Sequence, residues 1–219
     1  MFVGHAALAL GARTKAPSVS LGWLFAATFG LDLLWPLFLL LGVERVSIVP
    51  GATAFTPLVF DSYPWSHSLL MAIVWGGVAV GLAVGCGTPR GSALLLGALV
   101  VSHWVLDFVS HAPDLQLWPG NPDRFGLGLW NSVPGTLIVE GLLFLAGIAL
   151  YLRGTRALDR IGSLGLYALL LVCTAMWAPG PLSPLPPNPR ALAWFSLGLW
   201  LFIVWAGWAD RHRAARPAV

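Results

Sequence analysis

The stretch SHWVLDFVSH, residues 102–111, lies in an otherwise apolar segment of the chain. Its ionisable residues His103, Asp107 and His111 stand four positions apart, so a helix places them in one stripe on one face. Ionisable side chains are costly in hydrocarbon, and those found there usually face the bundle interior and mark a metal, proton or substrate site. The spacing His-x-x-x-Asp also lets two side chains from consecutive turns bind one cation. The stretch therefore predicts a membrane helix that carries a buried polar site.

The composition of the whole chain is that of an integral membrane protein. Of its 219 residues, 58% are hydrophobic and only 10% are charged, with a mean hydropathy of +0.80, whereas soluble domains carry about 25% charged residues. A bilayer is crossed by about 20 apolar residues in a helix. Six runs meet this length approximately, and they are residues 19–41, 66–85, 91–112, 132–152, 161–178 and 191–209.

The predicted fold class is an all-α integral membrane protein, with six transmembrane helices and a short N-terminal half-helix in one bundle. The half-helix is the apolar segment at residues 2–12, which is too short to span and is expected to dip into the bundle or to lie at the inner interface. We expect one polytopic membrane domain over residues 1–219. Its site-bearing part covers approximately residues 1–145, and the C-terminal helices at 161–209 act as a scaffold.

The distribution of positive charge predicts the orientation. Nine of the 12 Lys and Arg residues fall at one set of helix ends, and the other three, Arg45, Arg124 and Arg190, fall at the opposite ends. The positive-inside rule therefore places both termini in the cytoplasm, as in a protein integral to a bacterial-type cytoplasmic (inner) membrane. The expected partner is the lipid bilayer. The chain has no basic surface interleaved with aromatic residues of the kind that binds nucleic acid, and no sequence feature specifies an oligomeric state.

Two local features predict how the helices bend and pack. Pro36 removes a backbone hydrogen bond and is expected to kink its helix close to Asp32. Gly77, Gly81 and Gly85 stand at four-residue spacing, which is typical of a small-residue face for close helix contact.

Polar residues of separate predicted helices agree in depth. At about 1.5 Å of rise per residue, Asp32, His103, Asp107 and Glu140 all lie roughly 9–16 Å below the outer ends of their helices. His5 approaches from the other side, about 12 Å above the inner surface, so it reaches the same place only if the first segment inserts. This agreement predicts one shared site in the outer half of the membrane.

The residue types in this site predict a metal centre. The candidate ligands are His5, Asp32, His67, His103, Asp107 and His111. Imidazole and carboxylate together suit a divalent metal, above all zinc, and this many ligands could hold one or two ions. A bound cation also offsets the cost of burying carboxylates. Asp114 and Glu140 are the candidates for a catalytic acid or base.

Structural roles compete with these assignments for individual residues. A single histidine within the membrane often serves only as a hydrogen-bonding strut between helices. His111 could cap the C-terminus of its helix, Asp114 could be an ordinary loop carboxylate, and Glu140 could be an acid paired between helices.

The order of these motifs resembles a known family. A histidine stands early in a short apolar segment (His5), an aspartate stands in the next helix (Asp32), a His-Ser pair opens another helix (His67), and His-x-x-x-Asp follows (His103 to Asp107). This order is similar to that of the YdjM/DUF457-type family of predicted membrane-bound metal-dependent hydrolases, over roughly the first half of the chain.

The chain departs from that family's pattern in two places. A single Asp32 stands where the family usually has Pro-Asp-x-Asp, and Tyr63-Pro64-Trp65 stands where a basic residue commonly precedes the His-Ser pair. The family is distantly similar to zinc-dependent phospholipase C and to the P1-type nucleases. The resemblance therefore implies metal-dependent hydrolysis of phosphoesters, by analogy of fold.

Three functions follow from these features. The favoured one is a membrane-embedded metal-dependent hydrolase that acts on an ester or phosphoester of a lipid-like substrate at the extracytoplasmic side, because a bound metal lowers the pKa of water. The alternative is a cation or proton transporter or channel, since ion pathways use buried Asp, Glu and His residues. A third is an assembly subunit in which the acids and histidines only pair helices.

Overall fold

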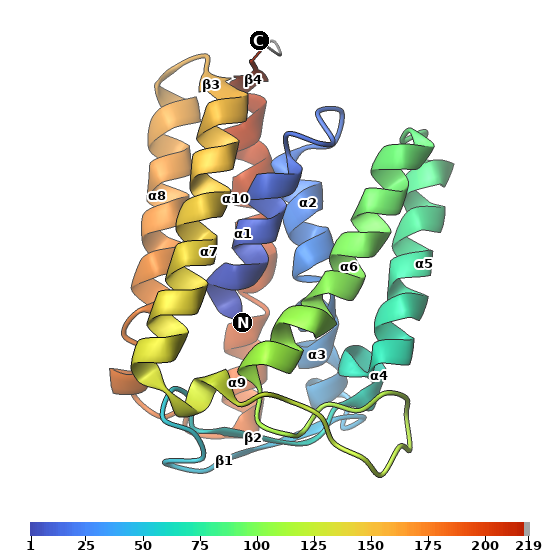
Figure 1. The fold of residues 1–219 in the computed structure, drawn as a ribbon, viewed down its shortest axis with the longest axis vertical. Helices are drawn as coiled ribbons and strands as arrows, with labels where there is room; N and C mark the ends of the chain where they lie inside the picture. Colours follow the sequence, from blue (N-terminus) through green and yellow to red (C-terminus); the bar gives the residue numbers. More distant parts are fainter. Residues whose placement is uncertain (217–219) are drawn as a thin grey trace.

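Helices make up most of the chain, and two small sheets lie at opposite ends of the helical bundle (Figure 1). The computed structural model describes residues 1–216, so the last three residues of the predicted domain lie outside the described part. The helices are α1 (Phe2–Ala12), α2 (Leu21–Thr28), α3 (Gly30–Leu40), α4 (Pro64–His67), α5 (Leu69–Gly85), α6 (Arg90–Ser110), α7 (Val133–Gly154), α8 (Arg160–Trp177), α9 (Pro189–Ser196) and α10 (Leu199–Arg211). Two short 3-10 helices are η1 (Leu129–Asn131) and η2 (Gly180–Leu182).

The strands are short and antiparallel. β1 (Arg45–Ile48) pairs with β2 (Leu58–Ser62), and β3 (Thr155–Ala157) pairs with β4 (Arg213–Ala215). The prediction of an all-α chain was wrong in this detail. Strands of three to five residues in loops are too short to give the alternating pattern by which a strand is recognised in a sequence.

The helical class is confirmed, and it includes helices that could span a membrane. Among residues 1–216, four helices are long and apolar enough to cross a membrane: α6, α7, α8 and the run Pro189–Arg211 that contains α9 and α10. The pair α2 and α3 gives a fifth if it is counted as one bent span. The remaining predicted span is represented by α5, which has 17 residues because the turn α4 forms a separate element before it.

The bend between α2 and α3 leaves a backbone carbonyl free to accept a hydrogen bond. The two helices meet at 57° around Phe29, seven residues before Pro36, which lies inside α3. The prediction that Pro36 makes the kink was therefore wrong. Carbonyl groups in the last turn of a helix lack partners within the helix. Here the carbonyl of Thr28, the last residue of α2, accepts a hydrogen bond from His103 on α6 at 2.7 Å.

Helix α1 is inserted among longer helices, which is the first of the two placements expected from the sequence. It packs against α7, α2 and α6, and Met1 lies inside the bundle, well below the end that carries β3 and β4 (Figure 1). The backbones of α1 and α7 touch, because a Cβ atom on Gly147 would lie only 2.5 Å from the carbonyl oxygen of Ala7. Glycine at this position allows the close approach that buries His5 to 1% exposure.

The close contact between α5 and α6 uses other glycines than expected. A Cβ atom on Gly77, Gly81 or Gly85 would meet no atom within 4 Å in the described structure. Gly76 and Gly97 make the contact instead, since a Cβ atom on Gly76 would lie 2.9 Å from the carbonyl oxygen of Gly97. The four-residue spacing was correct for a helix face, but that face is not the one that touches α6.

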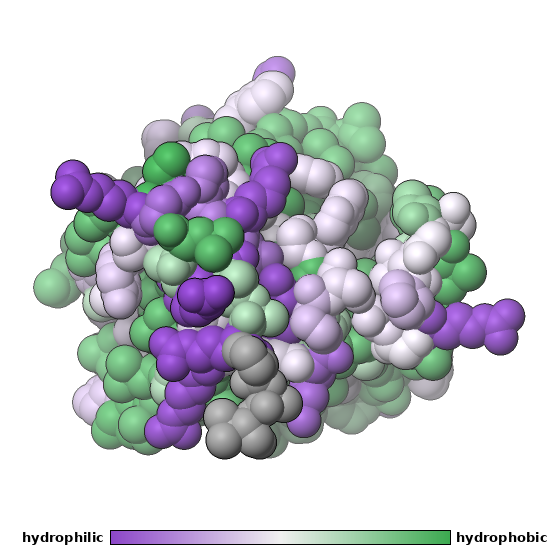
Figure 2. All heavy atoms as spheres, turned by 90° about the horizontal axis from the view of Figure 1, so that it is seen from above, coloured by the Kyte–Doolittle hydropathy of each residue, from purple (hydrophilic) through white to green (hydrophobic). Residues whose placement is uncertain are grey.

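A buried ion pair holds α1 to the rest of the bundle at the end opposite the hairpin β1–β2. Asp210 accepts hydrogen bonds from Arg13 Nε at 3.1 Å, from the Tyr151 hydroxyl at 2.6 Å and from the backbone N–H of Leu21 at 3.0 Å. These contacts join the segment after α1 to α2, α7 and α10. Figure 2 looks onto this end and shows hydrophilic side chains gathered over it, with hydrophobic ones around the periphery.

The variant Asp210→Asn tests this anchor. It leaves the buried Arg13 guanidinium without a charged partner, and breaking a buried pair in this way typically costs about 3–5 kcal/mol. We expect a markedly lower midpoint of thermal unfolding in detergent. Asp61→Asn is the matched control, because Asp61 is exposed and bonds the Ser47 hydroxyl; it is expected to change stability by less than about 0.5 kcal/mol. Equal midpoints for the two variants would contradict the assignment.

Candidate metal centre

The structure brings histidine and aspartate side chains from four helices into one buried cluster. His5 comes from α1, Asp32 from the first turn of α3, His67 from the end of α4, and His103 and Asp107 from successive turns of α6. Two groups of three have potential ligand atoms that all lie within 4.8 Å of one another: His5, His103 and Asp107 form one, and Asp32, His67 and His103 form the other. The cluster could therefore hold a metal ion.

Asp107 lies at the centre of this cluster. Its Oδ2 atom is 3.0 Å from His103 Nε2 and 3.8 Å from His67 Nε2, and its Oδ1 atom is 3.2 Å from His5 Nε2. Asp32 Oδ1 lies 3.4 Å from His67 Nε2 and 3.7 Å from His103 Nε2. Zinc bonds of 2.0–2.1 Å in a tetrahedron separate neighbouring ligands by roughly 3.3 Å. The separations between potential ligand atoms in the cluster range from 3.0 to 3.8 Å, so some are shorter and some longer than that value.

The tautomer of His103 makes the cluster electron-rich. Its Nδ1 atom faces the Thr28 carbonyl at 2.7 Å, and a carbonyl can only accept, so Nδ1 carries the proton. The Nε2 atom makes no hydrogen bond of acceptable geometry within residues 1–216, and in the neutral ring it would present a lone pair to the Asp107 carboxylate. Lone pairs and carboxylate oxygens that face one another in a buried site favour a cation between them.

His5 makes protonation a poor way to balance this charge. Its ring stacks on that of His103, with centroids 3.7 Å apart and planes 5° apart. The Nε2 atoms of both rings face Asp107, and that of His5 donates a hydrogen bond to Asp107 Oδ1 at 3.2 Å. Two imidazolium rings stacked this closely would repel each other, so at most one of them is charged. A metal ion that replaced the His5 Nε2 hydrogen could bind both nitrogens and Asp107 together. The Met1 ammonium group also donates to Asp107 Oδ1 at 2.5 Å and forms an ion pair with it, so it supplies positive charge at the same carboxylate.

His111 lies at the outer edge of the cluster. Its Nε2 atom is 3.9 Å from Asp107 Oδ2, and its Nδ1 atom is 3.1 Å from Asp114 Oδ1. It occupies the C-cap position of α6, but its side chain bonds Asp114. The Tyr63 hydroxyl also bonds Asp114. Burial, and next the negative charge of Asp114, raise the pKa of the Tyr63 phenol well above its usual value, so the hydroxyl stays protonated and donates to Asp114. The metal-ligand role of His111 stays a prediction.

Glu140 is buried but lies beside α1 and not among the ligand atoms. It has 0% exposure, and its Oε2 atom accepts from the backbone N–H of Gly4 at 3.5 Å. Its Oε1 atom has no hydrogen-bond partner within the described part of the chain. The catalytic roles predicted for Glu140 and Asp114 also stay predictions.

Sequence analysis missed two groups that hold the histidines in place. One is the Thr28 carbonyl, which a sequence cannot reveal because any residue supplies a backbone oxygen. The other is Glu44, a loop residue that is 2% exposed and accepts two hydrogen bonds from Ser66. Burial raises the pKa of the Glu44 carboxyl, and the two bonds from Ser66 act in the opposite direction. An acid in a polar outer loop gives no sign in the sequence that it is buried.

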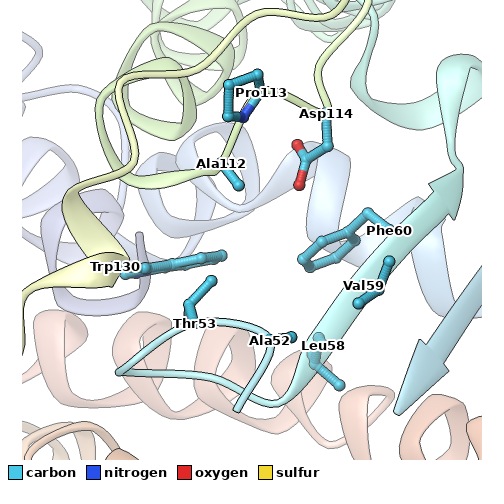
Figure 3. Close-up of a pocket in the computed structure, with 9 residues that line it drawn as sticks. All are labelled: Ala52, Thr53, Leu58, Val59, Phe60, Ala112, Pro113, Asp114 and Trp130. Atoms are coloured by element: carbon cyan, nitrogen blue, oxygen red, sulfur yellow. The ribbon is translucent and has the colours of Figure 1, made fainter. Parts of the chain in front are cut away.

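A pocket of about 200 Å³ opens beside the cluster at the end that carries the hairpin β1–β2. The Asp114 carboxylate points into it, with the rings of Phe60 and Trp130 on its walls (Figure 3). Asp114 connects the pocket to the cluster through His111. The pocket is lined by Ala52, Thr53, Leu58, Val59, Phe60, Ala112, Pro113, Asp114 and Trp130.

Comparisons with protein-family models, with curated proteins and with solved structures found no match for this chain.

Zinc content tests the cluster directly. We expect the purified protein to bind one or two zinc ions per chain, and His103→Ala to lose binding because this residue belongs to both groups of ligands. His212→Ala is the control, since His212 lies at the opposite end and pairs with the exposed Asp159. Elemental analysis after dialysis measures both. Wild-type protein that is folded and free of metal would contradict the prediction, as would full zinc retention by His103→Ala.

Proposed function

We propose that this chain is a membrane-embedded, metal-dependent hydrolase that acts on an ester or phosphoester of a lipid-like substrate at the extracytoplasmic side. The observation that carries the proposal is the unpaired Nε2 atom of His103 facing Asp107, in a cluster of three histidines and two aspartates. The metal is zinc or a similar divalent ion. One ion suits the geometry of His103, because its Nδ1 atom is used by Thr28 and its Nε2 atom can bind a single ion.

The proposed topology has six membrane crossings, with α2–α3 as one bent span, α5 as a short one and the end of α10 in the cytoplasm. The prediction of a cytoplasmic N-terminus is not kept, because Met1 is buried in the bundle beside Asp107 and the chain reaches the cytoplasmic end only at Arg13. Arg13, Arg153 and Arg160 then lie at the cytoplasmic end, and the hairpin β1–β2 lies outside. This orientation puts the pocket and Asp114 on the extracytoplasmic side and the cluster below them, in the outer half of the membrane.

Membership of the YdjM/DUF457-type family is part of this proposal. The residues that carry the resemblance lie far apart in the sequence, and their side chains meet in one cluster: His5, Asp32, His67, His103 and Asp107. A chance match of short motifs would not require them to meet. This convergence supports the family's hydrolase chemistry over a purely structural role for these residues.

Substrate reaches the cluster at Asp32. Its side chain is 32% exposed, whereas those of His67, His103 and Asp107 are 4% exposed or less. The walls of the neighbouring pocket are largely apolar, with Phe60 and Trp130 prominent. A substrate with an apolar body and one ester group fits these surroundings, because the body replaces lipid contacts and the ester lies against the polar cluster.

The chain's own residues divide the chemistry between them. A bound divalent ion supplies Lewis acidity that lowers the pKa of water to about 7, which provides a nucleophile at neutral pH. Asp107 and the imidazole Nε2 atoms hold the ion, and Thr28 keeps His103 in the tautomer that can bind it. Asp114, which points into the pocket, is held as a carboxylate by Tyr63 and His111, so it takes a proton from the attacking water and then passes that proton to the leaving group. Glu140 is the second candidate for proton transfer.

A cation or proton pathway is the competing proposal. The insertion of His5 from the cytoplasmic side favours it. However, fully buried apolar side chains, including Leu10, Leu24 and Phe25, fill the bundle between the cluster and Arg13. A conducted ion would have to cross this apolar layer, so the hydrolase is the better explanation of the cluster.

Hydrolysis of chromogenic phosphoesters and carboxyl esters, with acyl chains of several lengths, tests the reaction class. We expect zinc-dependent turnover that a chelator abolishes, that added zinc restores and that His103→Ala lacks. If zinc-loaded protein turned over no ester while reconstituted vesicles showed an ion flux that His103→Ala removes, the hydrolase would be replaced by the pathway.

The role of Asp114 has a separate test. Asp114→Asn removes the carboxylate that is proposed to transfer the proton, and general acid–base catalysis typically contributes about 10²–10⁴-fold. We expect kcat to fall by that order while zinc content stays unchanged. Asp123→Asn is the matched control, because Asp123 is an exposed acid of the same loop. Equal kcat values for Asp114→Asn and Asp123→Asn would remove Asp114 from the mechanism.

A further inference from the structure

Glu44 is a buried carboxylate in the loop between α3 and β1, and it lies directly behind one of the candidate ligands. Its Oε1 atom accepts the backbone N–H of Ser66 at 2.8 Å, and its Oε2 atom accepts the Ser66 hydroxyl at 2.7 Å. Both residues are almost fully buried, with exposures of 2% and 0%. Glu44 is not itself a candidate ligand. A buried carboxylate that makes two hydrogen bonds to one residue indicates a structural role.

Ser66 continues the contact to His67. The Ser66 Oγ atom lies 2.7 Å from His67 Nδ1 as well as 2.7 Å from Glu44 Oε2. A hydroxyl has a single hydrogen, and a carboxylate accepts only, so the hydrogen of Ser66 goes to Glu44. The Ser66 oxygen is then free to accept the Nδ1–H of His67. This order leaves the His67 Nε2 atom unprotonated, 3.4 Å from Asp32 and 3.8 Å from Asp107.

We propose that Glu44 is a positioning residue of the metal centre, which acts through Ser66 to hold His67 in the tautomer that binds the ion. The inference rests on the proposed metal-dependent function. Metal-binding histidines commonly donate their other ring N–H to a carboxylate or carbonyl, which fixes the ring's orientation and raises its basicity. For His103 this partner is the Thr28 carbonyl. For His67 the partner is the Ser66 hydroxyl, which is itself bonded to the Glu44 carboxylate.

The same contact joins two parts of the chain that each supply a ligand. Glu44 follows α3, which carries Asp32, and Ser66 belongs to α4, which carries His67. The two hydrogen bonds between Glu44 and Ser66 therefore also set the distance between these ligands. A four-residue helix such as α4 has little stability of its own, so its position depends on such tertiary contacts.

Three variants of the full-length protein in detergent test the inference, with zinc affinity measured by competition against a chromophoric chelator. Glu44→Gln can donate from its amide to Ser66, which turns the serine hydrogen towards His67 Nδ1 and disfavours the binding tautomer. Ser66→Ala removes the connection. We expect each to weaken zinc binding by about 10–100-fold. Ser66→Thr keeps the hydroxyl and is expected to bind zinc nearly as tightly as the wild type.

The double variant Glu44→Gln/Ser66→Ala separates positioning from general loss of structure. If Glu44 acts through Ser66, the double variant binds zinc no more weakly than the worse single variant, whereas independent structural defects would add. The cobalt-substituted protein gives a second readout, because a change in the orientation of His67 alters the visible absorption of the ion. Wild-type zinc affinity in both single variants, or additive losses in the double variant, would overturn the inference. Wild-type protein that binds no zinc would instead overturn the proposed function.

Discussion

The hydrogen bond from His103 to the Thr28 carbonyl is the contact on which the site depends. It exists because the span at α2 and α3 breaks at Phe29 and leaves a carbonyl without a partner in its own helix. That carbonyl places the proton on Nδ1, and the free Nε2 atom then faces Asp107. An unbroken helix would keep the carbonyl for itself and would also carry Asp32 in another direction. A local defect in secondary structure thus creates the ligand geometry.

The fold supports this site by bringing a short helix into the bundle. α1 crosses only part of the membrane, yet it supplies His5, the ring that stacks on His103. Gly147 lets the backbones of α1 and α7 touch, and Asp210 holds Arg13 at the far end of α1. Burying the Asp107 carboxylate among imidazoles is unfavourable without a compensating cation. Close packing of α1 buries the cluster, and this burial in turn requires a positive charge beside Asp107.

The sequence predicted the helical membrane class and the residues of the cluster, because both leave strong signals. Ionisable residues inside apolar runs are rare. His103 and Asp32 also lie at similar estimated depths below the outer ends of their predicted helices, so both could be assigned to one site from the sequence. Features that depend on tertiary placement were not predictable. The bend was assigned to Pro36 when it lies at Phe29, and Glu44 gave no sign of burial. The hairpin β1–β2 was missed because its strands are too short to show a period.

An anomalous-scattering map recorded at the zinc edge from crystals of the zinc-loaded protein tests the central claim most directly. The account predicts a peak within about 2.0–2.2 Å of His103 Nε2 and of an Asp107 oxygen, with the Nδ1 atom of His103 still bonded to Thr28. A map with no peak at this cluster, or with zinc bound only at surface residues such as His212, would contradict it.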